Sequence, residues 1–157
     1  MLESLRDVKG FDEPAFVEVH ESGRQVVSIR FNPFKNAAHV SPAPVFASVP
    51  WASEGVFLTE RPSFTADPLL HAGAYYVQEA SSMFLEQALL QTVNMSGALR
   101  VLDLCAAPGG KSTHIQSLIN ENSLLVSNEI IKQRVNVLNE NLVKWGGANT
   151  IVTNNDP

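Results

Sequence analysis

The chain has 157 residues, of which 45% are hydrophobic and 17% charged, which is the composition of a globular protein and excludes a disordered tail. No apolar run reaches the roughly 18 residues that cross a bilayer, and no signal peptide opens the chain, so we expect a soluble, cytoplasmic protein. One cysteine excludes an internal disulfide, and four scattered histidines give no metal-site spacing. The net charge of −5 argues mildly against a broad nucleic-acid-binding surface.

Residues 1–70 are predicted to form a small α+β unit that ends in an irregular connector. A weak helical pattern follows Pro14, and residues 27–32 alternate between apolar and polar side chains, which predicts a half-buried strand closed by Pro33. Five prolines between residues 36 and 68 exclude long helices there and favour short strands such as residues 55–58. The polar face of the first strand carries Ser28, Arg30 and Asn32.

Residues 71–157 are predicted to form the first half of a doubly wound, Rossmann-like α/β domain. Residues 75–93 contain neither glycine nor proline and predict a helix, whose apolar stripe is Ala80, Met83, Phe84 and Ala88. Strands near 100–105, 124–128 and 149–153 then alternate with helices near 110–120 and 131–145, a βαβαβ order typical of a parallel sheet. The last helix has an apolar face of Val135, Leu138, Leu142 and Trp145, and Gly146 with Gly147 predicts a left-handed cap.

The stretch VLDLCAAPGGKST, residues 101–113, joins the first of these parallel strands to its helix. In such sheets, ligands bind beyond the carboxyl ends of the strands, where a helix N-terminus offers unpaired N–H groups. A phosphate-binding P-loop is disfavoured because its first glycine would fall on Cys105, and the Gly-x-Gly-x-x-Gly dinucleotide fingerprint is absent. S-adenosylmethionine, which has no phosphate, fits a turn with fewer glycines.

Groups suited to this cofactor occur at three successive strand ends. Ala106 and Ala107 would let the backbone approach the ligand, Gly109 and Gly110 would present N–H groups, and Lys111 would place a charge near the carboxylate. Glu129, which follows the second strand, would accept hydrogen bonds from the ribose hydroxyls. Asn154, Asn155 and Asp156, after the third strand, suit an adenine amino group.

Each of these residues also has a purely structural interpretation. Lys111 can be a solvated helix residue, Glu129 an acid favoured at a helix N-terminus, and Asp156 a turn residue before proline. Cys105 fits a small apolar filler at a buried strand end better than a nucleophile.

The chain resembles the Nop/Sun-type RNA 5-methylcytosine methyltransferases, particularly the bacterial RsmF-like enzymes. The motifs that carry the resemblance are DLCAAPGGKS, NE eighteen residues beyond its lysine, and NND, with SIRFNPFK, VPW, RPSF and DPLLHAGAYYVQEASSM upstream. The resemblance implies S-adenosylmethionine as cofactor and RNA, specifically ribosomal RNA, as partner, with neither DNA nor a membrane. The segment SIRFNPFK resembles an RNA-binding appendage, so Arg30 and Asn32 on its polar face are expected either to contact RNA or to be solvated strand residues. The implied cofactor contacts are Cys105, Ala106, Ala107, Pro108, Gly109, Gly110, Lys111, Glu129 and Asp156.

In that family one cysteine adds to carbon 6 of the cytosine and a second helps to release the product, and both lie in motifs after the fourth and fifth strands. The sequence ends at Pro157, so no residue is assigned as catalytic. We expect the cofactor-binding part of a longer enzyme, inactive by itself, which self-associates through the bare edge of the strand at 100–105. The alternative is a stand-alone cofactor-binding or interaction module, which the sequence beyond Pro157 would distinguish. The roles of Gln78 and Ser82 stay open.

Overall fold

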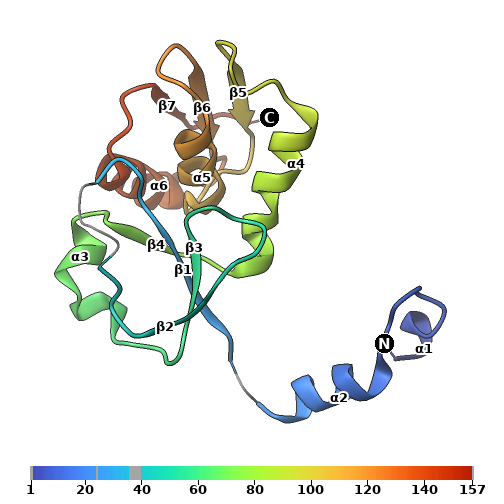
Figure 1. Cartoon of the computed structure of the whole chain (residues 1–157). Helices are drawn as coiled ribbons and strands as arrows, with labels where there is room; N and C mark the ends of the chain where they lie inside the picture. The colour runs from blue at the N-terminus through green and yellow to red at the C-terminus, as the bar shows by residue number, and fades with distance from the viewer. Residues whose placement is uncertain (1, 24, 36–39, 157) are drawn as a thin grey trace.

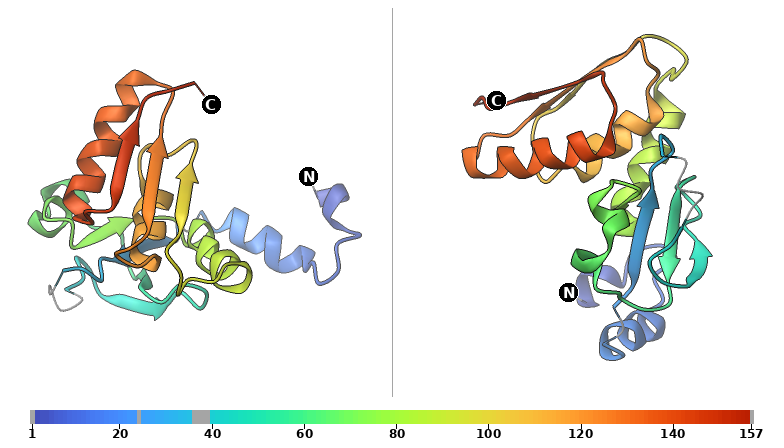
Figure 2. Two further views of the ribbon diagram at one scale, coloured as in Figure 1. Left: turned by 90° about the horizontal axis from the view of Figure 1, so that it is seen from above. Right: turned by 90° about the vertical axis from the view of Figure 1, so that its left-hand side faces the viewer.

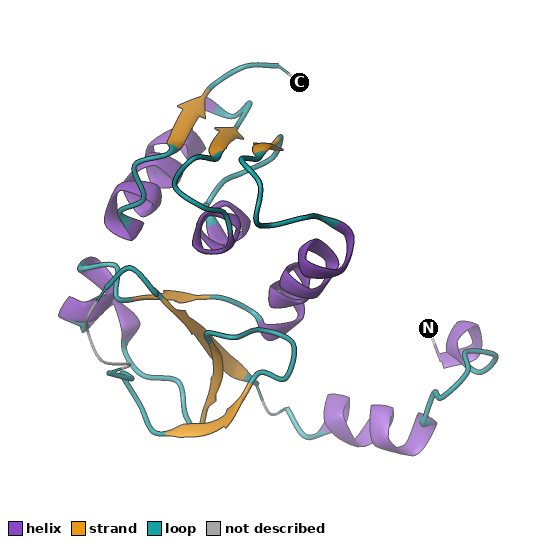
Figure 3. Ribbon diagram, turned by 45° about the horizontal axis from the view of Figure 1, so that its top comes forward, coloured by secondary structure: helices purple, strands orange, loops and turns teal. Residues whose placement is uncertain are grey.

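Two β-sheets organise the chain, and a layer of helices lies between them (Figure 1). The computed structural model describes residues 2–23, 25–35 and 40–156. The first sheet is antiparallel with strand order β2-β3-β1-β4, and the second is parallel with order β5-β6-β7. Figure 3 shows α5 (Gly110–Leu118) and α6 (Lys132–Trp145) between the two sheets. The helices that follow the parallel strands therefore contact both units.

The first sheet is built on its central strand β1 (Val27–Phe31), which pairs with β3 (Gly55–Leu58) and with β4 (Tyr75–Val77). β2 (Val45–Ser48) extends the sheet beyond β3. A 3-10 turn at Phe64–Ala66 and the short α3 (Pro68–His71) lead into β4. Because β4 belongs to this sheet, the first unit runs past residue 70, where the sequence placed its boundary.

The prediction of a half-buried first strand is wrong, because every residue of β1 is buried. Ile29 and Phe31 pack into an apolar cluster with Leu58 and Tyr75 on one face of the sheet. The polar face is covered as well, because it lies against α5 and α6, and its side chains find polar partners there. Apolar and polar side chains do alternate along the strand as predicted, but both faces of the strand are buried inside the protein.

The helix predicted over residues 75–93 starts later than expected. Tyr75–Val77 form β4, a 3-10 segment follows at Ala80–Phe84, and the α-helix α4 spans only Leu85–Thr92. Two aromatic residues and a valine favour a strand where a partner edge is available, and β1 supplies that edge. In the predicted stripe Ala80 and Met83 are buried, whereas Phe84 and Ala88 are exposed.

The second sheet confirms the predicted βαβαβ order. Its strands are β5 (Arg100–Asp103), β6 (Leu124–Asn128) and β7 (Thr150–Thr153). Leu138 and Leu142 of α6 are buried beneath the sheet with Ala106 and Ala107. α6 ends at a left-handed Gly146 with φ +94°, which confirms the predicted cap.

Both α5 and α6 cover the same face of the second sheet, as Figure 2 shows in its right-hand view. Strand register aligns Leu102, Val126 and Ile151 across β5, β6 and β7. Leu102 is 58% exposed and Ile151 is 51% exposed, so few of the described residues pack against this row of side chains. β5 is also an edge strand of the described sheet.

The N-terminal helices α1 (Leu2–Leu5) and α2 (Glu13–Glu21) extend away from the two sheets, and neither contains a buried residue (Figure 1). The Asp12 side chain caps α2 by accepting a hydrogen bond from the Ala15 N–H at 3.0 Å. In the described part of the chain, no helix combines enough length with enough apolar character to cross a membrane.

Candidate cofactor site

The β5–α5 turn, residues 104–109, leads from the end of β5 into the first turn of α5. Gly109 has φ +111°, which favours glycine, and its N–H donates to the Ala106 carbonyl oxygen at 2.8 Å. The prediction that the Gly109 N–H faces a ligand is therefore wrong. The donors that remain at this end are the first N–H groups of α5, beginning with Gly110, which have no carbonyl partner within the helix.

Glu129 lies at the end of β6, directly beside this turn. Its Oε2 accepts a hydrogen bond from the Ala107 N–H at 3.3 Å and lies 3.4 Å from Nη1 of Arg134. Its Oε1 accepts a hydrogen bond from the Ile131 N–H at 3.0 Å, where α6 begins. The carboxylate thus joins the end of β6 to the β5–α5 turn, as expected for neighbouring strands of a parallel sheet.

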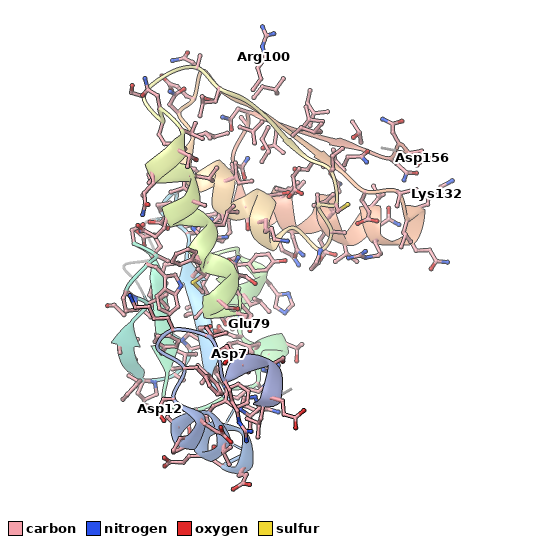
Figure 4. The ribbon with its side chains drawn as sticks, turned by 90° about the vertical axis from the view of Figure 1, so that its right-hand side faces the viewer. Asp7, Asp12, Glu79, Arg100, Lys132 and Asp156 are labelled. Atoms are coloured by element: carbon pink, nitrogen blue, oxygen red, sulfur yellow. The ribbon has the colours of Figure 1, made fainter. Side chains whose placement is uncertain are left out.

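The chain after β7 reaches the same end of the sheet. Nδ2 of Asn154 donates to the Glu129 carbonyl oxygen at 2.6 Å, and the Asn155 N–H donates to Oδ1 of Asn128 at 3.0 Å. Figure 4 shows Asp156 on the same side of the molecule as Lys132, the first residue of α6, and away from Arg100, which begins β5. Asp156 is exposed. Three strand ends are therefore gathered at one edge.

Lys111 and Cys105 are both exposed at this edge. Exposure leaves the Lys111 ammonium able to contact a ligand carboxylate and equally able to stay solvated. The expectation that Cys105 fills buried space is wrong.

Sequence reasoning missed a polar chain behind the turn. Oγ of Ser112 donates to Oδ2 of Asp103 at 2.7 Å, and Oγ of Ser127 donates to Oγ of Ser112 at 3.0 Å. These two hydrogen bonds link the ends of β5 and β6 to the first turn of α5. Asp103, an acid within the apolar run VLDL, is the feature of the sequence that could have indicated these buried polar contacts.

The structure corrects the assignment of Arg30 to RNA contact. Its side chain is fully buried, with Nε donating to Oε1 of Gln78 at 2.9 Å and Nη2 donating to Oγ1 of Thr113 at 2.7 Å. The guanidinium also lies 4.5 Å from the ring centre of Trp145. Burial lowers the pKa of Arg30 to about 9, which leaves it charged at neutral pH. Gln78, whose role the sequence left open, is one of its partners.

Asn32 is likewise interior, and its proposed RNA contact is wrong for the same reason. Nδ2 of Asn32 donates to the carbonyl oxygens of Gly73 and Trp145, each at 2.8 Å. It therefore ties the first unit to the end of α6. The polar face of β1 binds protein, because the second unit lies on it.

A buried acid and histidine join α4 to α5. Nε2 of His114 lies 2.9 Å from Oε2 of Glu86, whose Oε1 accepts a hydrogen bond from the Ser53 N–H at 2.9 Å. Burial, reinforced by the nearby Arg30 charge, lowers the pKa of His114 to about 4 despite the hydrogen bond to Glu86. Burial alone would raise the pKa of Glu86, but the hydrogen bonds from His114 and Ser53 outweigh it and lower the pKa. At neutral pH the pair is a neutral imidazole donating to a carboxylate.

We expect the free energy of unfolding to fall by roughly 3 kcal/mol as the pH drops from about 6.5 to about 4, because the unfolded His114 takes up a proton that the folded one resists. The stabilisation is complete above the unfolded pKa and is lost as the pH approaches the folded value. Urea unfolding across this pH window measures the effect. His114→Gln, which keeps a donor for Glu86 without titrating, should flatten the slope, and an equal slope in both proteins would contradict the assignment.

The described residues contain no group of three His, Cys, Asp or Glu side chains placed to hold a metal ion. The polar groups at the strand ends are instead a carboxylate, backbone donors and a lysine. This set suits an organic ligand with hydroxyl and carboxylate groups.

Family models match nearly the whole chain. Residues 1–80 match the N-terminal domain of 16S rRNA methyltransferase RsmF, and residues 89–157 match 16S rRNA methyltransferase RsmB/F. The chain belongs to the family of the 16S rRNA methyltransferase RsmF. The family predicted from the sequence is thereby confirmed, and S-adenosylmethionine is the cofactor of this family.

Curated relatives agree with this family. The chain is 39% identical over 115 residues to the ribosomal RNA small subunit methyltransferase F of Shewanella denitrificans, and 38% identical over 112 residues to that of Pectobacterium atrosepticum. These matches cover 71% and 69% of the chain but 23% of each relative. The chain therefore matches about a quarter of the length of these relatives.

Solved structures confirm the predicted methyltransferase fold. A methyltransferase homolog protein from Pyrococcus horikoshii superposes with a TM-score of 0.70 at 28% identity, over 92% of this chain and 48% of that one. NSun6 from the same organism, solved with SFG, gives a TM-score of 0.53 at 26% identity, over 64% of this chain and 24% of that one.

The residues at the strand ends fit the cofactor of this family. The Glu129 carboxylate is an acceptor for hydroxyl groups, and the first N–H groups of α5 suit a carboxylate. Both contacts to Oε2 of Glu129 exceed the roughly 2.8 Å of a strong charge-assisted hydrogen bond. The Glu129 side chain is almost completely buried, so a ribose hydroxyl would have to displace one of these contacts to reach the carboxylate.

Proposed function

We propose that this chain holds the S-adenosylmethionine-binding part of an enzyme that methylates carbon 5 of a cytosine in small-subunit ribosomal RNA. The observation that supports it is the Glu129 carboxylate, 3.3 Å from the Ala107 N–H of the β5–α5 turn. The proposed cofactor contacts are the residues Cys105 to Lys111, apart from the Gly109 N–H, which donates to Ala106, with Glu129 and Asp156.

In this proposal, the residues at the carboxyl ends of the parallel strands bind different parts of the cofactor. Glu129 accepts the ribose hydroxyls, and the N-terminal N–H groups of α5 with Lys111 bind the amino-acid carboxylate. The bound cofactor supplies an electrophilic methyl group. In this proposal the cysteine that adds to the base and the cysteine that helps to release the product belong to motifs that the 157 residues do not include, so the isolated chain binds cofactor without transferring a methyl group. A ribosomal RNA substrate places the enzyme in the cytoplasm.

Calorimetric titration of the chain with S-adenosylhomocysteine tests the cofactor site. Saturable binding with one site per chain supports it, and the absence of heat and of a thermal shift from the folded chain would refute it. Methyl transfer by the full-length enzyme to ribosomal RNA, mapped by bisulfite reading, tests the reaction. A modified base other than cytosine, or no modified base, would refute that part.

The isolated chain is further proposed to self-associate through β5 and the exposed row beside it. β5 is an edge strand of the described sheet and its Leu102 is 58% exposed, whereas Ile151 lies on β7 at the opposite edge. We expect sedimentation velocity to show concentration-dependent oligomers, and Leu102→Lys to shift them towards the monomer. Val143→Lys, at a 70% exposed apolar position on α6, is the matched control and should leave the distribution unchanged. A monomer at all concentrations would exclude this contact.

A further inference from the structure

Side chains from the first sheet and from α6 bind the carbonyl oxygens of the β5–α5 turn and of the first residue of α5. The Tyr76 hydroxyl donates to the Pro108 carbonyl oxygen at 3.2 Å, and Nδ2 of Asn141 donates to the same oxygen at 2.8 Å. Nη2 of Arg30 donates to the Gly110 carbonyl oxygen at 3.4 Å. Tyr76 and Arg30 belong to β4 and β1 of the first sheet, and Asn141 belongs to α6.

Arg134 completes the set from α6, with Nη2 donating to the Ala107 carbonyl oxygen at 2.6 Å. Three carbonyl oxygens within four residues thus have side-chain donors, and two of the five donating side chains come from the first sheet; the fifth is Thr113 of α5, which donates to the Gly110 oxygen at 3.1 Å. This number of side-chain donors is more than a short surface turn needs, because its carbonyl groups can accept hydrogen bonds from water.

Holding a carbonyl group also fixes the N–H group of the same peptide. The peptide unit is planar and its N–H points opposite to its C=O, so Arg30 and Thr113, which donate to the Gly110 oxygen at 3.4 Å and 3.1 Å, help the first turn of α5 to hold the direction of the Lys111 N–H. The contacts to the Pro108 oxygen fix the peptide of Gly109, whose N–H closes the turn on Ala106. Of the donors proposed for the cofactor carboxylate, the contacts to the Gly110 oxygen hold the Lys111 N–H directly, whereas Tyr76 and Asn141 act on the turn from which α5 starts.

We propose that Tyr76, together with Asn141 and Arg30, is a positioning residue for the cofactor. Through it the first sheet helps to build the cofactor site. This inference rests on the proposed function in one respect, the placement of the cofactor at the β5–α5 turn. None of the three side chains needs to touch the cofactor, because they act through the backbone.

Two adjacent tyrosines of β4 provide the test. Tyr76→Phe removes the hydroxyl that holds the turn and keeps the ring against Trp145, 6.4 Å between ring centres. Tyr75→Phe removes a hydroxyl that donates to Oδ2 of Asp67 at 2.6 Å, within the first unit. We expect Tyr76→Phe to raise the dissociation constant of S-adenosylhomocysteine about three- to tenfold, since one neutral hydrogen bond is lost. Tyr75→Phe should lower the melting temperature and leave the dissociation constant unchanged.

Asn141→Ala combined with Tyr76→Phe leaves the Pro108 oxygen without either donor, and the double variant should weaken binding more than either change alone. Amide hydrogen exchange of Gly110 and Lys111, measured without ligand, is the second readout and should accelerate in Tyr76→Phe and not in Tyr75→Phe.

These readouts separate the inference from the proposed function. A wild-type chain that does not bind S-adenosylhomocysteine refutes the proposed cofactor site, and the exchange rates still decide whether Tyr76 holds the turn. A wild-type chain that binds, with both tyrosine variants equal to it in affinity and in exchange at Gly110 and Lys111, overturns the positioning role alone.

Discussion

Gly73→Ala is expected to lower the free energy of unfolding by about 3 kcal/mol, measured by urea denaturation. A Cβ at this position would overlap the carbonyl group of Lys144, whose carbon would lie 2.6 Å away. Both groups are backbone, so neither can turn aside as a flexible side chain can, and such overpacking costs roughly 1–3 kcal/mol. The left-handed backbone of Gly73, φ +69°, adds about 1 kcal/mol for any L-residue.

The two backbones at this contact cannot separate freely. Asn32 bridges them by donating to the carbonyl oxygens of Gly73 and Trp145, so a displacement of α6 would break buried hydrogen bonds. Gly146→Ala is the matched control, because Gly146 also has a left-handed backbone but faces only the end of the Lys35 side chain at 3.4 Å. It should cost about 1 kcal/mol. Equal losses in the two variants would mean that the first unit and α6 are not packed together at this point.

The second unit could be predicted well because its information is local. The apolar runs ending at Asp103 and Asn128 and the 3.6-residue period of α6 each identify an element without reference to the rest of the chain. The proximity of Glu129 to the β5–α5 turn followed from parallel topology, since neighbouring strands end at the same edge.

The first unit shows where such reading fails. Arg30 and Asn32 occupy a polar strand face, and the sequence does not reveal whether water or a polar interior lies opposite. Here the partners are Thr113 and Trp145, more than 80 residues away along the chain. The same holds for Glu86, an acid that is buried because His114 and Ser53 meet it. Long-range polar contacts of this kind carry no periodic signal.

Within the site, the residue types were easier to predict than their hydrogen bonds. The turn was identified from its alanines and glycines, but the closure of the Gly109 N–H on Ala106 depends on a backbone conformation that composition does not specify. The donors behind the turn, such as Tyr76 and Asn141, come from other elements and so had no local motif.

Glu129→Gln is expected to raise the dissociation constant of S-adenosylhomocysteine about ten- to a hundredfold in calorimetric titration. A carboxylate accepts hydrogen bonds from both ribose hydroxyls, and bonds to a charged acceptor contribute roughly 1.5–3 kcal/mol, about twice the neutral value. The amide keeps the size of the side chain and removes the charge. Glu140→Gln, at an exposed acid of α6 that pairs with Lys144, is the matched control and should bind as the wild type does.

Loss of affinity in Glu129→Gln has a competing structural explanation, because the carboxylate also accepts from the N–H groups of Ala107 and Ile131. The 2′-deoxy analogue of S-adenosylhomocysteine separates the two. If Glu129 binds the ribose, removing the 2′-hydroxyl weakens binding to the wild type by severalfold and has far less effect on Glu129→Gln, since the contact is already impaired there. If Glu129 only supports the turn and the start of α6, the hydroxyl contributes equally in both proteins. If both proteins lose the same affinity when the 2′-hydroxyl is removed, Glu129 has only a structural role and another residue binds the ribose.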